Sequence, residues 1–300
     1  MTIREYVDIQ RALGEKIVDL NNVYWRRIWP FFYRPILPFI EYSPESVNIP
    51  RASFLGGVQH AVFPPEIANS YMNFLMFDDL QGYSSNSLQY NCRRQIKLAS
   101  KQFLIRPIYE VDELKDKGHK LYLEFYERTN YSYKSKRQKQ NHFFAWADTL
   151  FRFSKTIMLG GYNNNELSAI GICYLVDDIL IYATFFCSNK ALSLHVSDLM
   201  LHSIRELAAE SQNIRYIFTG MYEPKKGTVA FYLFRGCKII RKPSLYRINW
   251  LALFLLRILM PKQYQRLCGN YEMSMVIQNC TNYGNLKEQK REMKHDICNM

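Results

Sequence analysis

The 300-residue chain lacks several features that mark common protein classes. It has no C-x-x-C pair among its seven widely spaced cysteines, which argues against a disulfide framework or a zinc site and predicts reduced thiols in a cytoplasmic protein. Its six histidines show no H-E-x-x-H spacing, so we expect no metal site. The first 22 residues contain no long apolar stretch, so no signal peptide is expected there.

Long apolar runs are also missing, since none reaches the roughly 18 residues that a membrane-spanning helix needs. The nearest candidate is WLALFLLRILM at residues 250–260, which has eleven residues and contains Arg257. Its composition favours a buried helix, and the alternative is a helix that lies on a membrane surface. The second reading predicts peripheral contact through residues 246–262 with the inner face of the membrane.

Acidic residues are absent between Glu223 and Glu272, a segment that contains ten lysines or arginines. A second block, residues 84–142, has thirteen basic and six acidic residues. The formal net charge of the whole chain is +12, so the remainder is net acidic. Two such basic blocks predict an anionic partner, which can be a polyanion such as tRNA, a phosphorylated substrate or an anionic membrane face.

Hydrophobic periodicity and turn residues predict a mixed α+β chain. The expected helices are residues 1–22, 65–81, 85–102, 112–129, 140–153, 192–210 and 229–234. The expected strands are residues 103–109, a three-stranded meander over 156–187, and single strands at 214–220 and 237–242. Residues 23–42 combine aromatic and basic side chains with three prolines. They favour a loop packed by its own rings, with nucleic-acid or lipid-headgroup binding as the alternative.

The segment FYLFRGC, residues 231–237, follows the meander, a long helix and a strand. In this order it resembles the second half of a GNAT-type acyltransferase, whose last helix carries a tyrosine, three residues, a glycine and an aromatic. Phe231, Tyr232 and Gly236 match that pattern, whereas Cys237 replaces the final aromatic residue. Two further segments, LQYNCRRQIKLASKQFLIRPI and LYLEFYERTNYSY followed by HFFAWADTLF, resemble the FemAB and BioF2-like branch of the superfamily.

This resemblance covers residues 84–242, about half of the chain. It implies tandem GNAT-like domains, the first degenerate, each a mixed β-sheet flanked by helices. The expected domains are a degenerate one at 1–105, the GNAT-like acyltransferase domain at 106–245, and a basic apolar helix, final strand and polar tail at 246–300. The strand with Tyr216–Phe218 is expected beside the strand around Ile181.

Acyl transfer of the kind that the resemblance implies needs a base, an oxyanion donor and an acid for the leaving group. Tyr232 is the candidate acid, and Glu223 is the candidate base. The candidate donor-binding or anion-binding residues form three groups: Ser188, Asn189 and Lys190; Lys225, Lys226 and Arg235; and Arg93, Arg94 and Lys97. Each candidate has a structural alternative, namely a packed tyrosine, a surface loop carboxylate or a solvated basic face.

GNAT proteins usually open their long helix with a glycine-rich turn that holds the CoA pyrophosphate. The corresponding segment here, CSNKALSLHVSDLM, has no glycine, which argues against acetyl-CoA. The cofactor is therefore left open, with acyl-CoA or aminoacyl-tRNA as co-substrate. The leading hypothesis is transfer of an acyl or aminoacyl group to an amine of an anionic, cell-envelope precursor. The alternatives are an acyl-CoA-dependent N-acetyltransferase and a catalytically inactive GNAT-fold binding protein.

Overall fold

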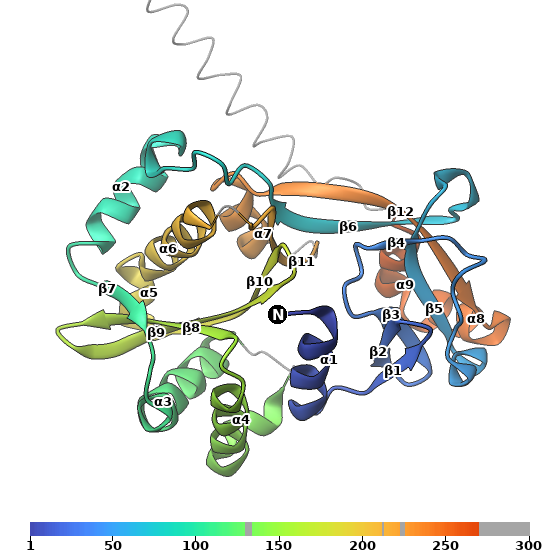
Figure 1. The fold of residues 1–300 in the computed structure, drawn as a ribbon, viewed down its shortest axis with the longest axis horizontal. Helices are drawn as coiled ribbons and strands as arrows, with labels where there is room; N and C mark the ends of the chain where they lie inside the picture. Colours follow the sequence, from blue (N-terminus) through green and yellow to red (C-terminus); the bar gives the residue numbers. More distant parts are fainter. Residues whose placement is uncertain (130–133, 212, 223–225, 270–300) are drawn as a thin grey trace, which may run out of the picture.

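The computed structural model describes residues 1–129, 134–211, 213–222 and 226–269 (Figure 1). The strands are β1 (Ile17–Leu20), β2 (Val23–Trp29), β3 (Phe32–Pro35), β4 (Glu41–Tyr42), β5 (Gly57–Val62), β6 (Ser70–Phe77), β7 (Leu104–Pro107), β8 (Thr156–Asn163), β9 (Glu166–Val176), β10 (Ile179–Cys187), β11 (Tyr216–Met221) and β12 (Lys238–Ile248). The α-helices are α1 (Ile3–Ala12), α2 (Tyr90–Ala99), α3 (Val111–Thr129), α4 (Gln140–Arg152), α5 (Asn189–Ser193), α6 (Val196–Glu210), α7 (Lys226–Leu233), α8 (Trp250–Leu259) and α9 (Pro261–Cys268). Short 3-10 helices are η1 (Arg51–Leu55), η2 (Pro65–Ile67), η3 (Ser85–Ser87) and η4 (Ser135–Gln138).

The strands form one mixed sheet in the order β1-β2-β3-β5-β12-β6-β11-β10-β9-β8-β7, with β4 paired to β5. Most neighbours are antiparallel, and the parallel pairs are β3 with β5, β4 with β5 and β10 with β11. Helices cover both faces of this sheet (Figure 1). The predicted class, a mixed α+β fold of mixed β-sheet flanked by helices, is therefore confirmed, and the strands are joined in one sheet where the prediction has a sheet in each of two domains.

Two hydrophobic layers hold the helices onto the sheet. One face packs against α1, α3 and α4, whose buried residues include Val7, Leu114 and Phe143. The other face packs against α2, α6 and α7, with Ile204 of α6 among its buried residues. Because both faces of the central strands are buried, these strands are apolar at successive positions instead of alternating with polar residues.

The sequence predicts a helix at residues 65–81, and this prediction is wrong, because Ser70–Phe77 form strand β6. Phe74 and Met76 enter one hydrophobic layer, whereas Leu75 and Phe77 enter the other. The strand lies between β12 and β11 and is antiparallel to both. An apolar run buried on two sides fits a central strand or a buried helix equally well, so local periodicity does not separate them.

Three other expectations change at element boundaries or in burial. The N-terminal helix ends at Ala12, and Ile17–Leu20 form β1 instead of a continued helix face. The long helix predicted at 192–210 is divided into α5 and α6 by His195, whose φ of 64° is left-handed. The helix at 250–260 is present as α8, but none of its residues is buried, so the prediction of a buried helix is wrong.

The expected neighbour relation between two C-terminal strands is confirmed. Strand β10 pairs in parallel with β11, and Ile181 is the register partner of Phe218. The sheet continues from this pair through β6 and β12 to β5. The domain boundaries near residues 105 and 245 stay a prediction.

Candidate functional site

The parallel strands β10 and β11 separate after a short stretch of pairing. Their register contains three residue pairs, which end at Ile181 and Phe218. Beyond this point β10 continues along β9 to Cys187, whereas β11 continues along β6 to Met221. The sheet therefore opens between two neighbouring strands near its centre, and this opening is called the strand gap below.

A β-bulge lies on each strand at the strand gap. The pairing of β10 with β9 shifts register between Tyr182 and Thr184, and the pairing of β11 with β6 shifts between Phe218 and Gly220. The residues that the two ladders skip are Ala183 and Thr219. A bulge leaves the extra residue out of the ladder and re-aims its neighbours, so backbone polar groups at these positions can face a ligand.

A cavity of about 490 Å³, called the α7 cavity, opens on one side of the strand gap. It is lined by Phe125, Thr129, Tyr182, Ala183, Thr184, Phe185, Thr219, Thr228 and Tyr232. The half-buried ring of Tyr232 packs edge-on against Phe77 and Phe231, and its hydroxyl has no hydrogen-bond partner among the described residues. Burial raises the pKa of Tyr232 well above its usual value of 10.0, so the phenol keeps its proton at neutral pH.

A second cavity of about 410 Å³, called the basic cavity, also reaches the strand gap. It shares Tyr182, Ala183, Thr184 and Thr219 with the α7 cavity, and α1, β2, β3, η4 and α4 contribute to its other walls. Its charged lining has four basic side chains and one carboxylate among the described residues. These are Arg26, Arg34, Lys134, Arg137 and Glu15.

Three of the four basic side chains of this cavity contact neighbouring side chains. The Arg34 guanidinium donates to Oε1 of Gln59 over 2.6 Å, and the Arg137 guanidinium lies over the Trp146 ring at 4.4 Å. Lys134 pairs with the single carboxylate of the lining. The formal excess of three positive charges favours an anionic ligand in the basic cavity.

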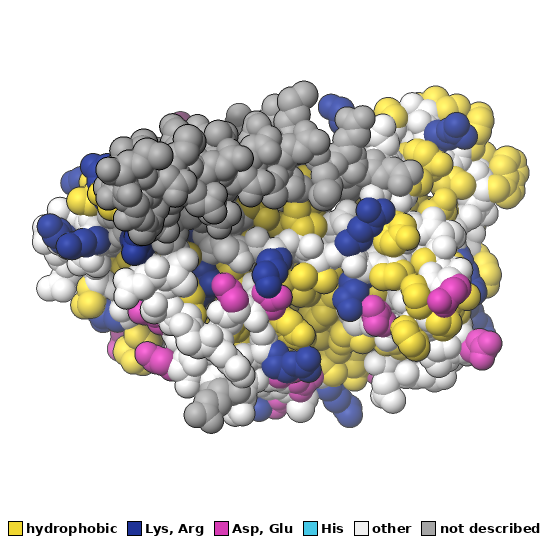
Figure 2. Space-filling model, turned by 90° about the horizontal axis from the view of Figure 1, so that it is seen from above, with side chains coloured by type: hydrophobic (Ala, Val, Ile, Leu, Met, Phe, Trp, Pro, Cys, Tyr) yellow, Lys and Arg dark blue, Asp and Glu magenta, His cyan; other side chains and the backbone are white. Residues whose placement is uncertain are grey.

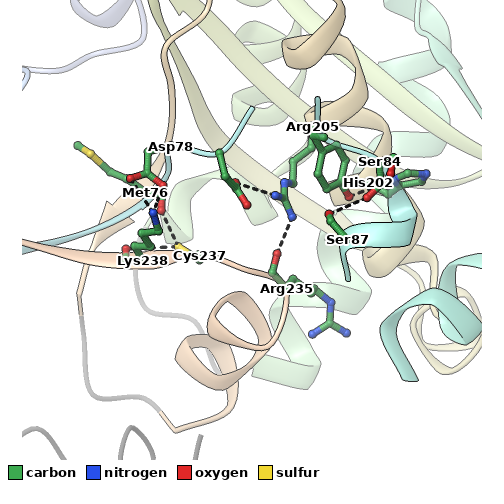
Figure 3. Close-up of polar contacts among 11 residues, drawn as sticks. Met76, Asp78, Ser84, Ser87, His202, Arg205, Arg235, Cys237 and Lys238 are labelled. Carbon is green, nitrogen blue, oxygen red and sulfur yellow. Dashed lines mark hydrogen bonds and ion pairs between the residues drawn. The ribbon is translucent and has the colours of Figure 1, made fainter. Parts of the chain in front are cut away.

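The end of α7 is fixed by a network around Arg205, which extends from α6 (Figure 3). The Arg205 side chain is 1% exposed and lies over the Tyr83 ring at 3.7 Å. It donates to the carbonyl of Arg235 over 2.5 Å and to Oδ1 of Asp79 over 2.8 Å. Gly236 follows with a φ of +88°, a left-handed conformation that glycine adopts without strain. This network fixes the helix that carries Tyr232.

The sequence-predicted residues are spread over several regions of the structure. Tyr232 reaches the strand gap. Arg235 lies near the end of α7, where its Nε donates to Oδ1 of Asp198 over 2.9 Å and its guanidinium stacks on Phe231. Arg93, Arg94 and Lys97 are exposed on α2, and neither cavity includes them.

Ser188, Asn189 and Lys190 lie at the start of α5. Ser188 Oγ accepts from the backbone N–H of Ala191, and the Asn189 N–H donates to Oε1 of Glu124 over 2.6 Å. A carboxylate therefore lies at the start of α5, the segment that the resemblance compares with the pyrophosphate-binding turn. Lys226 is the first residue of α7, and Glu223 and Lys225 lie outside the described residues.

Sequence reasoning did not assign the basic residues of the cavity to a site. Arg26 and Arg34 come from the segment 23–42, for which the sequence favours a packed loop, whereas the structure shows a hairpin of β2 and β3 there. Lys134 and Arg137 come from the basic connection NYSYKSKRQK before α4. Their aromatic and basic composition was the signal, but only the fold brings the two segments together.

Comparison with known proteins gives matches of fold and none of sequence. No protein-family profile matches the chain, and no curated protein matches it. The C-terminal domain (DUF2156) of a putative lysylphosphatidylglycerol synthetase from Agrobacterium fabrum is similar over 88% of this chain and 93% of its own, with a TM-score of 0.57 and 10% identity. A conserved protein of unknown function from Bacteroides thetaiotaomicron is similar over 81% and 88%, with a TM-score of 0.50 and 10% identity.

FemX is similar over 62% of this chain and 63% of its own, with a TM-score of 0.48 and 12% identity. The chain thus spans less than two thirds of FemX but most of the Agrobacterium domain. Tandem and single GNAT proteins also match in fold. The matches at a TM-score of 0.50 or above, over most of both chains, show that this chain shares its fold with the Agrobacterium and Bacteroides proteins.

Proposed function

We propose that the chain is an N-acyltransferase or aminoacyltransferase that works across the strand gap. The acyl donor enters from the α7 cavity, and the amine of an anionic, cell-envelope acceptor enters from the basic cavity. The observation that carries this proposal is the meeting of the two cavities at the same four residues of β10 and β11. A transferase needs two substrates whose reacting atoms meet in one place, and this arrangement provides such a place.

In the proposed reaction the acceptor amine attacks the acyl carbonyl carbon of the donor. A C–N bond forms, the bond from the carbonyl carbon to the donor oxygen or sulfur breaks, and the amine loses one proton to a base. The skipped residues Ala183 and Thr219 supply candidate backbone donors for the oxyanion. Tyr232 gives its proton to the departing oxygen or sulfur, and Glu223 stays the predicted base.

The donor class follows from the start of α5. This segment lacks glycine, and Glu124 already accepts from the Asn189 N–H. A pyrophosphate at the same place would lose a backbone donor and meet a negative charge, so both features favour an aminoacyl-tRNA over acyl-CoA. Lys190, Lys225, Lys226, Arg93, Arg94 and Lys97 are then the predicted contacts with the polyanion, in a cytoplasmic enzyme.

The alternatives make different predictions. An acyl-CoA-dependent N-acetyltransferase would be stabilised against heat by CoA, whereas the proposed aminoacyltransferase would be stabilised by charged tRNA and not by CoA. A catalytically inactive GNAT-fold protein would be stabilised by an anionic partner but would transfer nothing. Melting curves with each ligand separate the first two, and a product assay separates both from the third.

The decisive experiment replaces Tyr232 by phenylalanine. Because the ring and its packing are kept, Tyr232→Phe should leave the melting temperature and donor binding unchanged while turnover falls about 10²-fold, the scale of a lost proton donor. Turnover is measured with whichever donor, aminoacyl-tRNA or acyl-CoA, raises the melting temperature.

A matched control is Tyr162→Phe. The Tyr162 hydroxyl donates to Oε2 of Glu113 over 2.8 Å, and Tyr162 lines neither the α7 cavity nor the basic cavity. The control should lose about 1.5 kcal/mol of stability without loss of turnover. If Tyr232→Phe behaves like this control, Tyr232 has a structural role and the mechanism is wrong.

A further inference from the structure

Helix α8 has its exposed face made of large apolar residues. It begins after β12, with the Asn249 side chain accepting from the Leu251 N–H at its start. Trp250 is 77% exposed, Phe254 56% and Ile258 58%. These residues recur every four positions and therefore lie along one side of the helix. A surface helix normally buries such a stripe, whereas α8 presents it outward.

Apolar residues from two other elements extend this stripe. Asn249 donates from its backbone N–H to the Gly56 carbonyl and from Nδ2 to the Phe54 carbonyl, which brings η1 next to the start of α8. The Gly57 backbone N–H donates to the Phe31 carbonyl, which places the β2–β3 turn next to the end of η1. The exposed apolar residues of these elements, with α8, are called the apolar end: Trp29, Phe31, Phe54, Leu55, Trp250, Leu251, Phe254, Leu255, Ile258 and Leu259.

The apolar end lies at one extremity of the long axis of the molecule. Figure 1 places α8 at the right-hand edge, below β12. In Figure 2, which is turned about the horizontal axis, hydrophobic side chains gather at the same right-hand end. Exposed apolar side chains that gather at one end of a molecule mark a place where something docks.

The chain segment that contains α8 carries charged side chains of positive sign only. Arg247, Arg257 and Lys262 are exposed on or beside α8. From residue 226 to residue 269 the chain has no aspartate or glutamate. Exposed aromatic and aliphatic side chains with lysine and arginine in the same segment match the interface of an anionic bilayer, where the rings enter the headgroup region and the bases meet lipid phosphates.

We propose that the apolar end is a membrane-docking surface that lays α8 in the interface of an anionic lipid bilayer. The helix has ten residues, about 15 Å of length, which is half of a bilayer core. No described helix combines the length and the apolarity needed to cross a membrane. The docked state is therefore peripheral, and the inference does not depend on the proposed transfer reaction.

A second copy of the chain is a less suitable occupant for electrostatic reasons. A two-fold interface brings the same patch of both subunits together. Arg247, Arg257 and Lys262 of one copy would then face the same residues of the other without a carboxylate from this segment between them. An anionic bilayer supplies the opposite charge in place of this repulsion.

The test uses the full chain and phosphatidylcholine vesicles prepared with and without phosphatidylglycerol. We expect flotation with the anionic vesicles only, decreasing as salt is raised, together with a blue shift of Trp fluorescence that Trp250→Phe reduces. Phe254→Ser should weaken the vesicle partition about tenfold, and Arg257→Glu should weaken it by a similar factor. Circular dichroism shows that each variant is folded.

The matched control is Tyr109→Ser, since Tyr109 is as exposed as Trp250 (76%) but lies outside the apolar end. This control should bind vesicles like the wild type. Three outcomes overturn the proposal: no flotation at low salt, equal binding by Phe254→Ser and the wild type, or a dimer that Phe254→Ser dissociates while vesicles have no effect. An unchanged transfer activity in a variant that no longer floats would leave the proposed reaction intact.

Discussion

His60 of β5 is a buried histidine in an aromatic environment. Its ring is 2% exposed and meets Trp25 edge-on, with 5.9 Å between ring centroids, and its Nδ1 lies 3.0 Å from the Ala61 carbonyl. Burial lowers the pKa of His60 below its ordinary value of 6.5, and the nearby Arg247 charge acts in the same direction. The folded protein therefore holds this side chain neutral under conditions where an unfolded chain protonates it.

The first residue-scale prediction is a loss of stability in mild acid. Between the two pKa values of His60 the unfolded state binds more protons than the folded state, so the free energy of unfolding decreases as the pH falls below 6.5. Urea denaturation at about pH 7 and about pH 5 should show this decrease, and His60→Gln should reduce it. His202, whose pKa is also lowered by burial, accounts for a remaining slope.

The control for this experiment is His142→Gln, at an exposed position of α4. It should keep the full pH dependence of the wild type. A His60→Gln variant with the same pH dependence as the wild type would show that the acid sensitivity comes from other groups.

At the scale of elements, the position of α7 depends on what anchors its C-terminal end. Lys238 Nζ lies 2.9 Å from Oδ1 of Asp78, and the Cys237 thiol lies 3.4 Å from the Met76 carbonyl (Figure 3). Together with Arg205 these contacts join the turn after α7 to the end of β6. Tyr232 is on the last turns of this helix, so the orientation of its ring follows from the anchor.

We predict that Arg205→Ala destabilises the protein by about 3 kcal/mol, because the carbonyl and the carboxylate that it contacts lose a buried partner. Arg205→Lys keeps the charge but loses the planar stacking and the forked donation, so a smaller loss is expected. Chemical denaturation measures both. In Arg205→Ala the backbone amides of α7 should exchange hydrogen faster than in the wild type, and turnover should fall.

Arg215→Ala is the matched control for the anchor. The Arg215 side chain is 67% exposed and pairs with Asp178 at 3.3 Å, so its removal should leave the denaturation midpoint unchanged. If Arg205→Ala and Arg215→Ala have equal effects on stability and on α7 exchange, the buried arginine does not position the helix.

At the scale of the whole molecule, the positive charge is distributed over surfaces with different proposed partners. The basic cavity faces the strand gap, the bases of α8 surround the apolar end, and Arg93, Arg94 and Lys97 lie on α2. Long-range attraction to a polyanion depends on such clusters more than on the net charge of +12.

We predict that reversing the three α2 charges to glutamate weakens tRNA binding and makes it less sensitive to salt. Each lost phosphate contact lowers the slope of log K against log salt by about 0.7 for a single strand. Titrations at several salt concentrations measure both quantities. Reversal of Arg4, Lys120 and Arg215, three exposed bases that do not cluster on one helix face, changes the net charge equally and is the control.

Equal loss of affinity in the two triple variants would assign the effect to net charge alone. Absence of tRNA binding by the wild type at low salt would remove tRNA as the donor carrier and leave α2 as a solvated basic face. Neither result affects the vesicle experiment on α8.

The sequence alone determined the elements whose stabilising contacts are local. Helices α3 and α4 and the meander of β8, β9 and β10 lie within a few residues of their predicted bounds, because periodic apolar faces and turn residues act over short separations. The neighbour relation of the strands with Ile181 and Phe218 also followed, through the order of strands and the resemblance, and the structure adds that the two strands are parallel. The same local pattern selects Tyr232, because Gly236 follows the end of α7 at Leu233; the catalytic role of Tyr232 stays a prediction.

The tertiary structure decided what depends on distant segments. Strand β6 is a strand because β12, far along the chain, pairs with it through registers such as Arg241 with Asn73, and no local pattern contains that partner. The basic cavity exists because the β2–β3 hairpin and the connection before α4 face one another. The exposure of α8 has the same origin: the sequence gives its apolar residues, but only packing determines whether another element covers them.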